Sequence, residues 1–492
     1  MNYLPACARL LLILALLLAL APCQANPRLP VAKPAPLNEA DGYRFAFQYD
    51  PPRIPYIIIQ VSINGKPPLP FLLDTGTNAT IIIDTEAASK LGLKLNDARE
   101  GTINGKNSSA RTTVIKSLRF PSLDFWRHID FAQYPAFVID LSTFDTAFLG
   151  KKPAGIIGVS LLEQFTVRLD FPSKVLTLYL KPHPPISISG ATTVPLVEQK
   201  GKHRYFVQVS PAQNLSAGLL LDTGSVKTSL PLAVASQIQS TPRYGDSTFM
   251  LGSYYISQTL LLPKIKVGDY SLDNFAVSTS PVLRHCTLGI DLLSCFRVTL
   301  DFPHHQMFLE RAADRPYQLQ GWGGFTLKPS EKEFRVKTVE AGSPAEVAGL
   351  QVDDEIRSID GRTLHGLSLD AASRLRNGFA GTRATLLIQR GQSQPFTLSF
   401  VRANLFAAPP DIETGLTVEK PDKKPINVVQ VDAGSPAQRA GLVAGDTIIA
   451  LDGVLSVAMS ADQTDDAFGK DKLTLTVRRP GESKPRVLVL AK

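Results

Sequence analysis

The stretch "FLLDTGTNATIII" from Phe71 to Ile83 has a close copy, "LLLDTGSVKTSL", from Leu219 to Leu230. In each copy an apolar run, typical of a buried strand, is followed directly by an acid, a hydroxyl residue and a glycine. An unpaired carboxylate is costly to bury, so two such acids at the ends of apolar strands require an explanation. The duplication predicts that the two copies form two halves of a single site.

The N-terminal sequence "MNYLPACARLLLILALLLALAPCQANP" carries Arg9 before an apolar run that ends at Ala21 in small residues. This run is too short to span a bilayer, and we interpret residues 1–25 as a secretory signal peptide cleaved after Ala25. Lipid anchoring through Cys23 fits less well, because a proline precedes that cysteine. No later stretch is long and apolar enough for a membrane helix, so we expect a secreted or periplasmic protein.

The composition of the chain is that of ordinary globular domains, with 492 residues, 44% hydrophobic residues, 20% charged residues and a formal net charge of +8. Lysine and arginine form no long run and no stripe interleaved with aromatic residues, which argues against nucleic-acid binding. The sequence contains no His-x3-His, Cys-x2-Cys or G-x-S-x-G arrangement, so we predict no metal, no other cofactor and no serine nucleophile. Removal of the signal peptide leaves Cys286 and Cys295, which either form a disulfide in an oxidising compartment or remain two small buried thiols.

Two separate internal repeats organise the rest of the chain. In the first, "GVSLLEQFTVRLDFP" from Gly158 matches "GIDLLSCFRVTLDFP" from Gly289, and each block follows one of the D-T-G triplets. In the second, "AGSPAEVAGLQVDDEIRSIDG" from Ala341 matches "AGSPAQRAGLVAGDTIIALDG" from Ala433. Proline-rich stretches separate the repeats, and short apolar runs with turn residues between them predict β-rich domains.

The doubled triplet suits hydrolysis by a pair of carboxylates. Two neighbouring carboxyls cannot both ionise comfortably, so one keeps a proton while the other accepts a proton from an attacking water. We assign these roles to Asp74 and Asp222. Small and hydroxyl-bearing neighbours can support them: glycines allow close backbone approach, Thr77 and Ser225 can donate hydrogen bonds to the carboxylates, and a threonine in each loop can lock the loops together. These supporting residues are Thr75, Gly76, Thr77, Thr223, Gly224 and Ser225.

The pattern of an apolar strand, D-T-G-[ST] and a later apolar-apolar-Gly block resembles the retropepsin-like and pepsin-like aspartic proteases. In that family the second block, here Ile156–Gly158 and Thr287–Gly289, packs beneath the catalytic loop. The resemblance implies a mainly β fold in which two retropepsin-like β-barrel lobes form a pseudo-twofold bilobal aspartic protease. The predicted order is a Pro-rich linker at 26–40, lobe 1 at 41–182 and lobe 2 at 190–311.

The first repeat also duplicates a second pair of acids, Asp170 and Asp301, each within "LDFP". A bulky phenylalanine and a proline follow each of them, with neither a hydroxyl nor a glycine for close approach. We therefore interpret this pair as turn or capping residues.

The family pattern places a hairpin over the substrate in each lobe. "GTINGKNSSARTTV" from Gly101 and "YGDSTFMLGSYYISQT" from Tyr244 are the candidates, because their glycine-bearing turns suit mobile hairpins. Tyr254 or Tyr255 either contacts a bound peptide or belongs to the core, and both interpretations stay open.

The second repeat resembles PDZ domains of the bacterial, circularly permuted type, predicted here at 320–402 and 411–492 as two α+β domains. The family's carboxylate-binding loop holds a peptide C-terminus with backbone N–H groups beside an exposed strand edge. Such loops bind C-terminal peptide ligands or dock on the chain's own protease lobes. The matching residues are Gly324, Phe325, Thr326, Gly415, Leu416 and Thr417.

Together these patterns predict a secreted or periplasmic aspartic-type endopeptidase that acts on peptides or proteins and recognises them through its PDZ domains. Two other interpretations stay open. One is a catalytically silent peptide-binding scaffold on a protease fold. The other is a protease whose active sites form between chains, although two unlike lobes joined by a short linker favour an internal pair.

Overall fold

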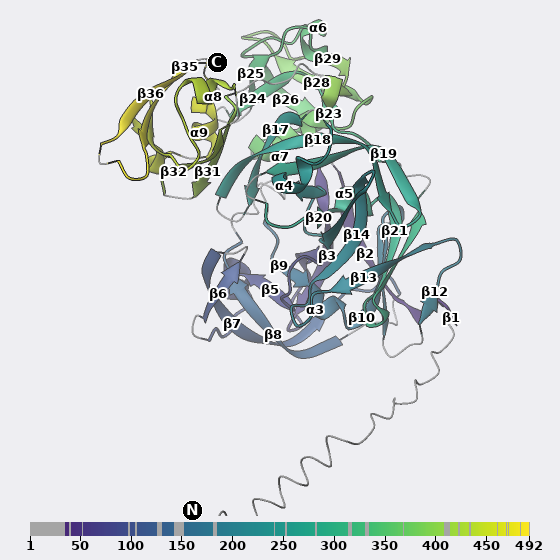
Figure 1. The fold of residues 1–492 in the computed structure, drawn as a ribbon. Helices are drawn as coiled ribbons and strands as arrows, with labels where there is room; N and C mark the ends of the chain where they lie inside the picture. Colours follow the sequence, from purple (N-terminus) through teal and green to yellow (C-terminus); the bar gives the residue numbers. More distant parts are fainter. Residues whose placement is uncertain are drawn as a thin grey trace, which may run out of the picture. The chain divides into compact units, whose positions relative to one another are not determined.

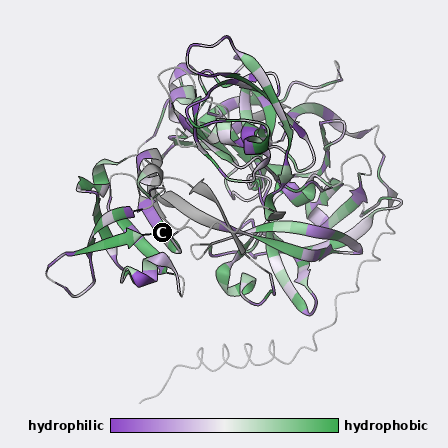
Figure 2. Ribbon diagram, turned by 90° about the horizontal axis from the view of Figure 1, so that it is seen from above, coloured by the Kyte–Doolittle hydropathy of each residue, from purple (hydrophilic) through white to green (hydrophobic). Residues whose placement is uncertain are grey.

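The structure is a computed structural model that describes residues 35–38, 41–51, 53–96, 99–103, 106–124, 130–141, 152–180, 185–240, 242–250, 253–280, 283–312, 317–329, 334–367, 369–407, 414–421, 424–431, 434–459, 461–468, 470, 472–482 and 484–491. It is mainly β, which confirms the predicted fold class at this level (Figure 1). Hydrophobic and hydrophilic residues are interleaved along many of its strands (Figure 2), as expected where one face of a sheet packs on a core. The predicted signal peptide lies outside the described residues.

The chain divides into two compact units. The smaller unit comprises residues 1–37 and 182–189, and its described part is a parallel pair formed by β1 (Ala35–Pro36) and β12 (Ile186–Ser187). All remaining elements belong to the larger unit.

In the first half of the larger unit, the described residues between 41 and 180 form mostly strands and two brief helices. Its apolar strands β3 and β4 pair antiparallel, and β4 continues in parallel pairing with β9, so that Asp74 stands opposite Gly158 at the strand ends. The elements are β2 (Tyr43–Asp50), β3 (Ile54–Ile63), β4 (Leu69–Asp74), β5 (Ile81–Asp84), α2 (Thr85–Lys90), β6 (Arg99–Ile103), β7 (Lys106–Arg119), β8 (Asp130–Ile139), β9 (Gly155–Gly158), α3 (Val159–Leu162), β10 (Phe165–Asp170) and β11 (Val175–Leu180).

The second half, residues 190–311, uses the same local pairings. Strand β15 pairs antiparallel with β14 and parallel with β20, as β4 does with β3 and β9. Its elements are β13 (Thr192–Glu198), β14 (Tyr205–Ala212), β15 (Leu215–Leu221), β16 (Ser229–Pro231), α4 (Leu232–Ala235), β17 (Pro242–Met250), β18 (Ser253–Val267), β19 (Tyr270–Ser280), β20 (Thr287–Leu288), α5 (Ile290–Leu293), β21 (Phe296–Asp301), η4 (Phe302–His304) and β22 (Gln306–Arg311).

A six-stranded antiparallel sheet joins the two halves, in the order β2, β11, β10, β21, β22, β13. The second acid pair lies on its two central strands. Asp170 accepts hydrogen bonds from Ser173 N at 3.1 Å and from Arg297 Nε at 3.1 Å. Asp301 is fully buried; it contacts His304 Nδ1 at 2.8 Å and accepts from Thr166 Oγ1 at 3.3 Å. Each acid therefore contacts a residue of the opposite half, which gives it a part in joining the halves.

The C-terminal region contains two modules with separate hydrophobic cores. The first module comprises β23 (Gly321–Trp322), β24 (Phe325–Pro329), β25 (Phe334–Val339), α6 (Pro344–Val347), β26 (Glu355–Ile359), β27 (Arg362–Thr363), α7 (Leu369–Asn377), β28 (Arg383–Gln389), β29 (Phe396–Val401), β30 (Ala403–Asn404) and η5 (Leu405–Ala407). The second comprises β31 (Leu416–Pro421), β32 (Ile426–Val431), α8 (Pro436–Arg439), β33 (Thr447–Leu451), β34 (Val454–Leu455), η6 (Ser456–Ala458), α9 (Ala461–Phe468), β35 (Lys472–Arg478) and β36 (Arg486–Ala491).

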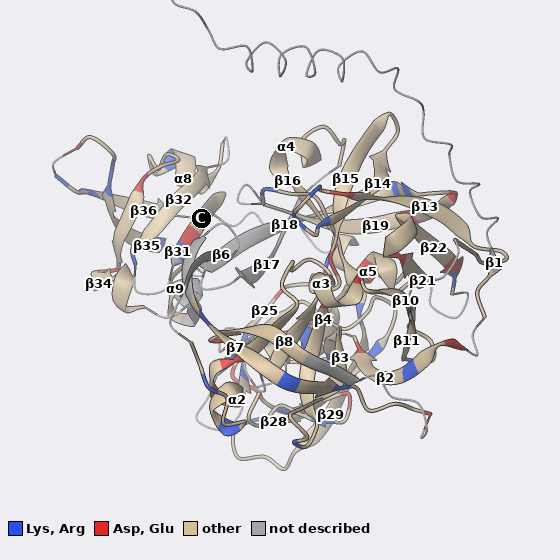
Figure 3. Cartoon of the chain, turned by 90° about the horizontal axis from the view of Figure 1, so that it is seen from below, with Lys and Arg blue, Asp and Glu red and all other residues tan. Residues whose placement is uncertain are grey.

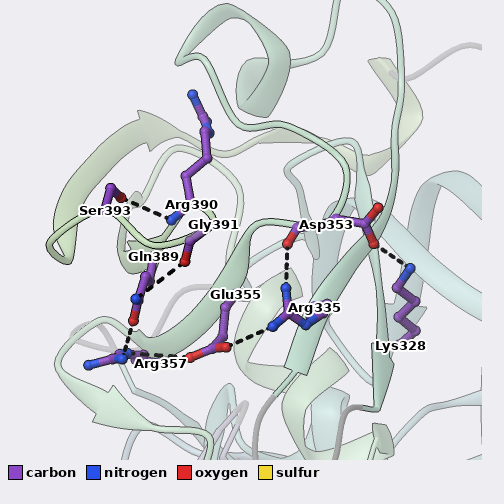
Figure 4. A network of polar contacts seen from close by, with 9 residues as sticks. All are labelled: Lys328, Arg335, Asp353, Glu355, Arg357, Gln389, Arg390, Gly391 and Ser393. Carbon is purple, nitrogen blue, oxygen red and sulfur yellow. Dashed lines mark hydrogen bonds and ion pairs between the residues drawn. The ribbon is translucent and has the colours of Figure 1, made fainter.

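The repeated sequence of the modules builds the same polar contacts twice. In the first module the buried Asp354 accepts from Arg390 Nε at 2.7 Å and from Gln351 N at 2.8 Å. In the second, Asp446 accepts from Arg479 Nε at 2.8 Å and from Val443 N at 3.0 Å. Around Arg390, further side chains of the first module form a surface network that links Lys328, Arg335, Asp353, Glu355, Arg357 and Gln389 (Figure 4).

Charged residues occur singly or in small groups along the elements drawn in Figure 3. Within the described residues, no helix has both the length and the apolar character needed to cross a membrane. Cys286 is partly exposed, Cys295 is buried, and no disulfide joins them. The disulfide that the sequence left open is therefore not formed, and the alternative of two separate thiols is the one that the structure contains.

Candidate functional site

Strands β4 and β15 carry the two triplet acids to one place. Leu73 and Leu221, directly before Asp74 and Asp222, are fully buried, which fixes both strand ends in the core. Each strand is held on both sides, by an antiparallel neighbour and by the short parallel strand of the second sequence block. A strand anchored in this way presents its terminal acid with little freedom, which is what preorganised chemistry requires.

The two loops grip one another through crossed hydrogen bonds. Thr75 Oγ1 donates to Leu221 O at 2.9 Å and accepts from Thr223 N at 3.0 Å. In the same way, Thr223 Oγ1 donates to Leu73 O at 2.8 Å and accepts from Thr75 N at 3.1 Å. Both threonines are buried, at 2% and 0% exposure, so these four bonds are shielded from water. The predicted locking of the loops is present in the structure.

The two carboxyls face each other between these loops and share a hydrogen bond. Asp74 Oδ1 accepts from Gly76 N at 2.8 Å and from Thr77 N at 3.2 Å, while Asp222 Oδ1 accepts from Gly224 N at 2.9 Å. The glycines leave no room for a side chain. A Cβ on Gly76 would lie 2.4 Å from Asp222 Cγ, and one on Gly224 would lie 2.5 Å from Asp74 Cγ.

The pKa of each carboxyl is raised. Burial raises the pKa of Asp222 well above its ordinary value, and the negative charge of Asp74 raises it further. Burial also raises the pKa of Asp74, against hydrogen bonds from Gly76 and others that lower it. Both side chains nevertheless keep some contact with solvent. The pair therefore holds one proton over a pH range in which an ordinary aspartate is ionised.

The second sequence blocks pack directly against the triplet loops, as the resemblance implied. Gly158 N donates to Thr80 O at 3.1 Å, and Ile290 N, after Gly289, donates to Ser225 O at 2.9 Å. A Cβ on Gly158 would lie 2.0 Å from Ala79 O, so no larger residue fits there without movement of the backbone.

One supporting contact differs from the prediction. The hydroxyl of Ser225 was expected to donate to a carboxylate, but it donates to Lys227 O at 2.9 Å. The carbonyl two residues along lies within reach of a short hydroxyl side chain, and this local bond takes its proton. On the first half, Thr77 reaches Asp74 through its backbone N–H at 3.2 Å.

Sequence reasoning missed Asp291, the second residue after Gly289. Its Oδ1 accepts from Thr228 Oγ1 at 2.7 Å, from Thr228 N at 2.8 Å and from Leu292 N at 2.8 Å. Burial raises its pKa to about 6 against these hydrogen bonds. Asp291 also lines a cavity of about 450 Å³ together with Lys227, Tyr317, Gln320 and Arg374. The available signal was a difference between the repeats, since "GVS" in the first half corresponds to "GID" in the second.

The predicted flap segments form hairpins. Strands β6 and β7 pair antiparallel in the first half, and β17 and β18 pair antiparallel in the second. The side chains of Tyr254 and Tyr255 lie outside the described part of the structure. Contact with a bound peptide and a place in the core therefore both stay predictions.

The predicted carboxylate-binding loops adopt backbone conformations that need glycine. Gly324 has φ +76° and Gly415 has φ +63°, a region that L side chains rarely adopt. Phe325 and Leu416 are buried in their module cores, at 3% and 5% exposure, and Thr326 Oγ1 contacts Thr338 Oγ1 at 2.6 Å. Of Thr417, the structure describes only the backbone. No group of three or more potential metal ligands occurs in the described part of the chain.

Comparison with family models gives one match in the first half and two in the C-terminal region. Residues 59–161 match the family model described as aspartyl protease. Residues 335–390 and 428–479 match the PDZ domain model, so the prediction of two PDZ domains is confirmed. Peptides are the ligand class that such domains imply.

Curated relatives match short parts of the chain. A probable CtpA-like serine protease of Staphylococcus haemolyticus is 32% identical over 14% of this chain and 14% of its own length. A carboxyl-terminal-processing protease of Synechocystis is 33% identical over 19% of this chain and 22% of its own. A probable periplasmic serine endoprotease DegP-like of Chlamydia muridarum is 31% identical over 27% of this chain and 32% of its own. The matches therefore span less than a third of each relative.

Two solved structures match parts of the chain, both with low TM-scores. The PDZ domain of a carboxy-terminal protease from Vibrio cholerae, solved in complex with a peptide, has 23% identity and a TM-score of 0.16 and covers 18% of this chain and 97% of that chain. Basic 7S globulin from soybean has 12% identity and a TM-score of 0.37 and covers 56% of this chain and 98% of that one.

These comparisons require a correction. The sequence predicted an aspartic-type endopeptidase, but two of the three relatives are named as serine proteases, which conflicts with that enzyme class. What the comparisons support is a protease-like chain with PDZ domains.

Proposed function

We propose that the chain hydrolyses peptide bonds at the carboxyl pair Asp74–Asp222 and that its PDZ domains recognise the peptides or proteins on which it acts. One observation carries the proposal. Two carboxyls share a hydrogen bond at the ends of strands from separate repeats, in loops that Thr75 and Thr223 lock together. A merely structural acid pair would not need both glycines to leave room for the opposite carboxyl.

The pair can perform the proton transfers that hydrolysis of a peptide bond needs. The ionised carboxylate accepts a proton from a water molecule, whose oxygen then attacks the carbonyl carbon of the peptide bond. The protonated carboxyl donates its proton to the carbonyl oxygen, which stabilises the charge that develops there. When the tetrahedral intermediate breaks down, the C–N bond breaks and the newly protonated carboxyl supplies a proton to the leaving nitrogen. The other carboxylate takes a proton back from a hydroxyl of the intermediate, which forms the product carboxyl group and restores the single proton of the pair. Since the pair must hold one proton, the rate should fall both at low pH and at high pH.

The domain organisation proposed here follows the two repeats. Residues 41–182 and 190–311 form two lobes around the carboxyl pair, related by a pseudo-twofold axis between β10 and β21. Residues 320–402 and 411–492 form the PDZ domains, whose loops at Gly324 and Gly415 bind C-terminal peptides. Cleavage of a signal peptide after Ala25 would deliver this protein outside the cytoplasm.

The test is peptide turnover by Asp74→Asn and Asp222→Asn variants of the full chain without residues 1–25. We expect each variant to lose turnover of a mixed peptide library while keeping the melting curve of the parent protein. Asp170→Asn is the matched control, since this acid is also duplicated and lies on β10 away from the carboxyl pair. A parallel arm treats the parent protein with a covalent serine-hydrolase reagent and with a transition-state analogue that binds paired carboxyls.

Three results would reject the proposal. Appreciable turnover by either folded Asn variant would exclude a shared proton pair as the catalyst. Inactivation by the serine reagent alone would assign catalysis to a serine, as the names of the relatives suggest. A parent protein that binds peptides but hydrolyses none across the pH range would be the silent scaffold.

A further inference from the structure

The two PDZ domains differ in what lies along the strand that follows each carboxylate-binding loop. In the first domain this strand is β24, and among the described residues its strand partner is β25. In the second domain the corresponding strand is β31, which pairs with β32 on one side and with β18 on the other. The edge to which a peptide would add in the second domain is therefore partly occupied by the chain itself.

The register of this pairing defines which part of the edge is taken. Strand β18 runs antiparallel to β31, with Ser253 opposite Pro421, Tyr254 opposite Lys420 and Tyr255 opposite Glu419. The same residues of β18 also pair with β17. The hairpin β17–β18 of the second half therefore lies along the edge of the PDZ sheet, with β18 next to β31. Farther along the same strand, from Gln258 onward, β18 pairs with β19.

The part of β31 nearest the loop has no pairing with β18. Residues 416–418, which directly follow Gly415, lie outside the register of β18 and β31. A peptide that adds antiparallel to this edge places its C-terminal residue beside the loop and one residue opposite each successive position of β31. About three C-terminal residues fit before the ligand reaches Glu419, the first position of β31 that is paired with β18.

We propose that hairpin β17–β18 occupies the outer part of the peptide-binding edge of the second PDZ domain, so that a C-terminal tripeptide binds beside the hairpin and a longer extended peptide displaces it. Strand β18 runs in the direction that such a ligand would take, and its backbone makes the bonds that the ligand would make. Two strands cannot share one edge, so the ligand and the hairpin exclude one another. This inference rests on the proposed binding of C-terminal peptides at the loop of Gly415, and it holds whether or not the chain hydrolyses peptides.

The pairing itself is tested by disulfide trapping in the full chain. Tyr255→Cys with Glu419→Cys places two cysteines directly opposite one another, at a separation that a disulfide can bridge. The matched control, Tyr254→Cys with Glu419→Cys, shifts the register by one residue and sends the two side chains to opposite faces of the sheet. We expect mass spectrometry to find the bridge in the first variant at least about tenfold more often than in the control. Equal trapping in both variants would overturn the register.

Displacement is tested by hydrogen–deuterium exchange in the parent protein. Two synthetic peptides with the same three C-terminal residues and a free carboxylate, one of three and one of eight residues, are added at saturating concentration. We expect the octapeptide to speed exchange by about tenfold or more at those amides of residues 253–255 that point to β31, since they lose their partner strand while the pairing with β17 remains. The tripeptide and a C-terminally amidated octapeptide should leave that exchange unchanged. An octapeptide that leaves exchange at residues 253–255 unaltered would overturn the proposal, as would a tripeptide with the same effect as the octapeptide.

Discussion

Replacing Thr75 by valine should destabilise the protein by an amount that the crossed hydrogen bonds set. Valine has nearly the shape of threonine, so packing is kept while the hydroxyl is lost. Loss of the hydroxyl removes two hydrogen bonds. Leu221 O and Thr223 N then lack the Thr75 hydroxyl as a partner, at a buried position. Each buried polar group left unpaired costs about 1–3 kcal/mol, so the free energy of unfolding should fall by about 2–6 kcal/mol.

Two control variants separate the hydroxyl from other effects. Thr75→Ser keeps both bonds and removes one buried methyl group, which costs about 1 kcal/mol. Thr113→Val removes a single buried hydroxyl that donates to Lys94 O at 2.7 Å, far along the chain from the acid pair, and should cost about half as much as Thr75→Val. Differential scanning calorimetry of the full chain gives the shift of the transition that includes the two halves. If the free energies of unfolding of Thr75→Val and Thr75→Ser differ by less than about 0.5 kcal/mol, the crossed hydrogen bonds do not hold the loops together.

Three further variants test the surroundings of the pair. Gly76→Ala places a Cβ 2.4 Å from Asp222 Cγ, so the carboxyl must move, and kcat/KM for peptides should fall at least about 100-fold; an unchanged value would show that the apposition is unimportant. The pKa of Asp291, raised to about 6, means that the folded state holds the proton more tightly than the unfolded state, so this group's contribution to stability declines as pH rises from about 4 to about 6. Asp291→Asn should therefore gain up to about 3 kcal/mol relative to the parent between pH 4 and pH 7 in urea denaturation, and a pH-independent difference would contradict the assignment. Asp301→Asn weakens the contact with His304 and should lower the free energy of unfolding by about 1–3 kcal/mol without lowering kcat of the folded protein; loss of kcat with an unchanged melting curve would make it part of the catalytic site.

The sequence predicted those features that a short pattern can specify. An apolar run followed by Asp-Thr-Gly locates a buried strand and its terminal acid, and the repeat shows that Asp74 and Asp222 belong together. Asp291 escaped prediction because only one repeat carries an acid there, and the burial that raises its pKa comes from segments distant in sequence. The pairing of β18 with β31 escaped for another reason. It consists of bonds between backbones more than 150 residues apart, and backbone pairing leaves no mark in residue identity.

The two halves are alike where they build the site and differ where they contact the PDZ domains. Strand β4 of the first half corresponds to β15 of the second, and both halves contribute a threonine to the crossed hydrogen bonds and a glycine beside the opposite carboxyl. The differences lie in the second half. Its hairpin strand β18 pairs with β31 of the second PDZ domain. Lys227, which lines the cavity together with Asp291, donates from Nζ to Gln320 Oε1 at 3.2 Å, at the start of the first PDZ domain. Lys227 lies only two residues beyond Ser225 of the triplet loop. The second half therefore contacts both PDZ domains, one through its hairpin and the other through the loop that follows its triplet.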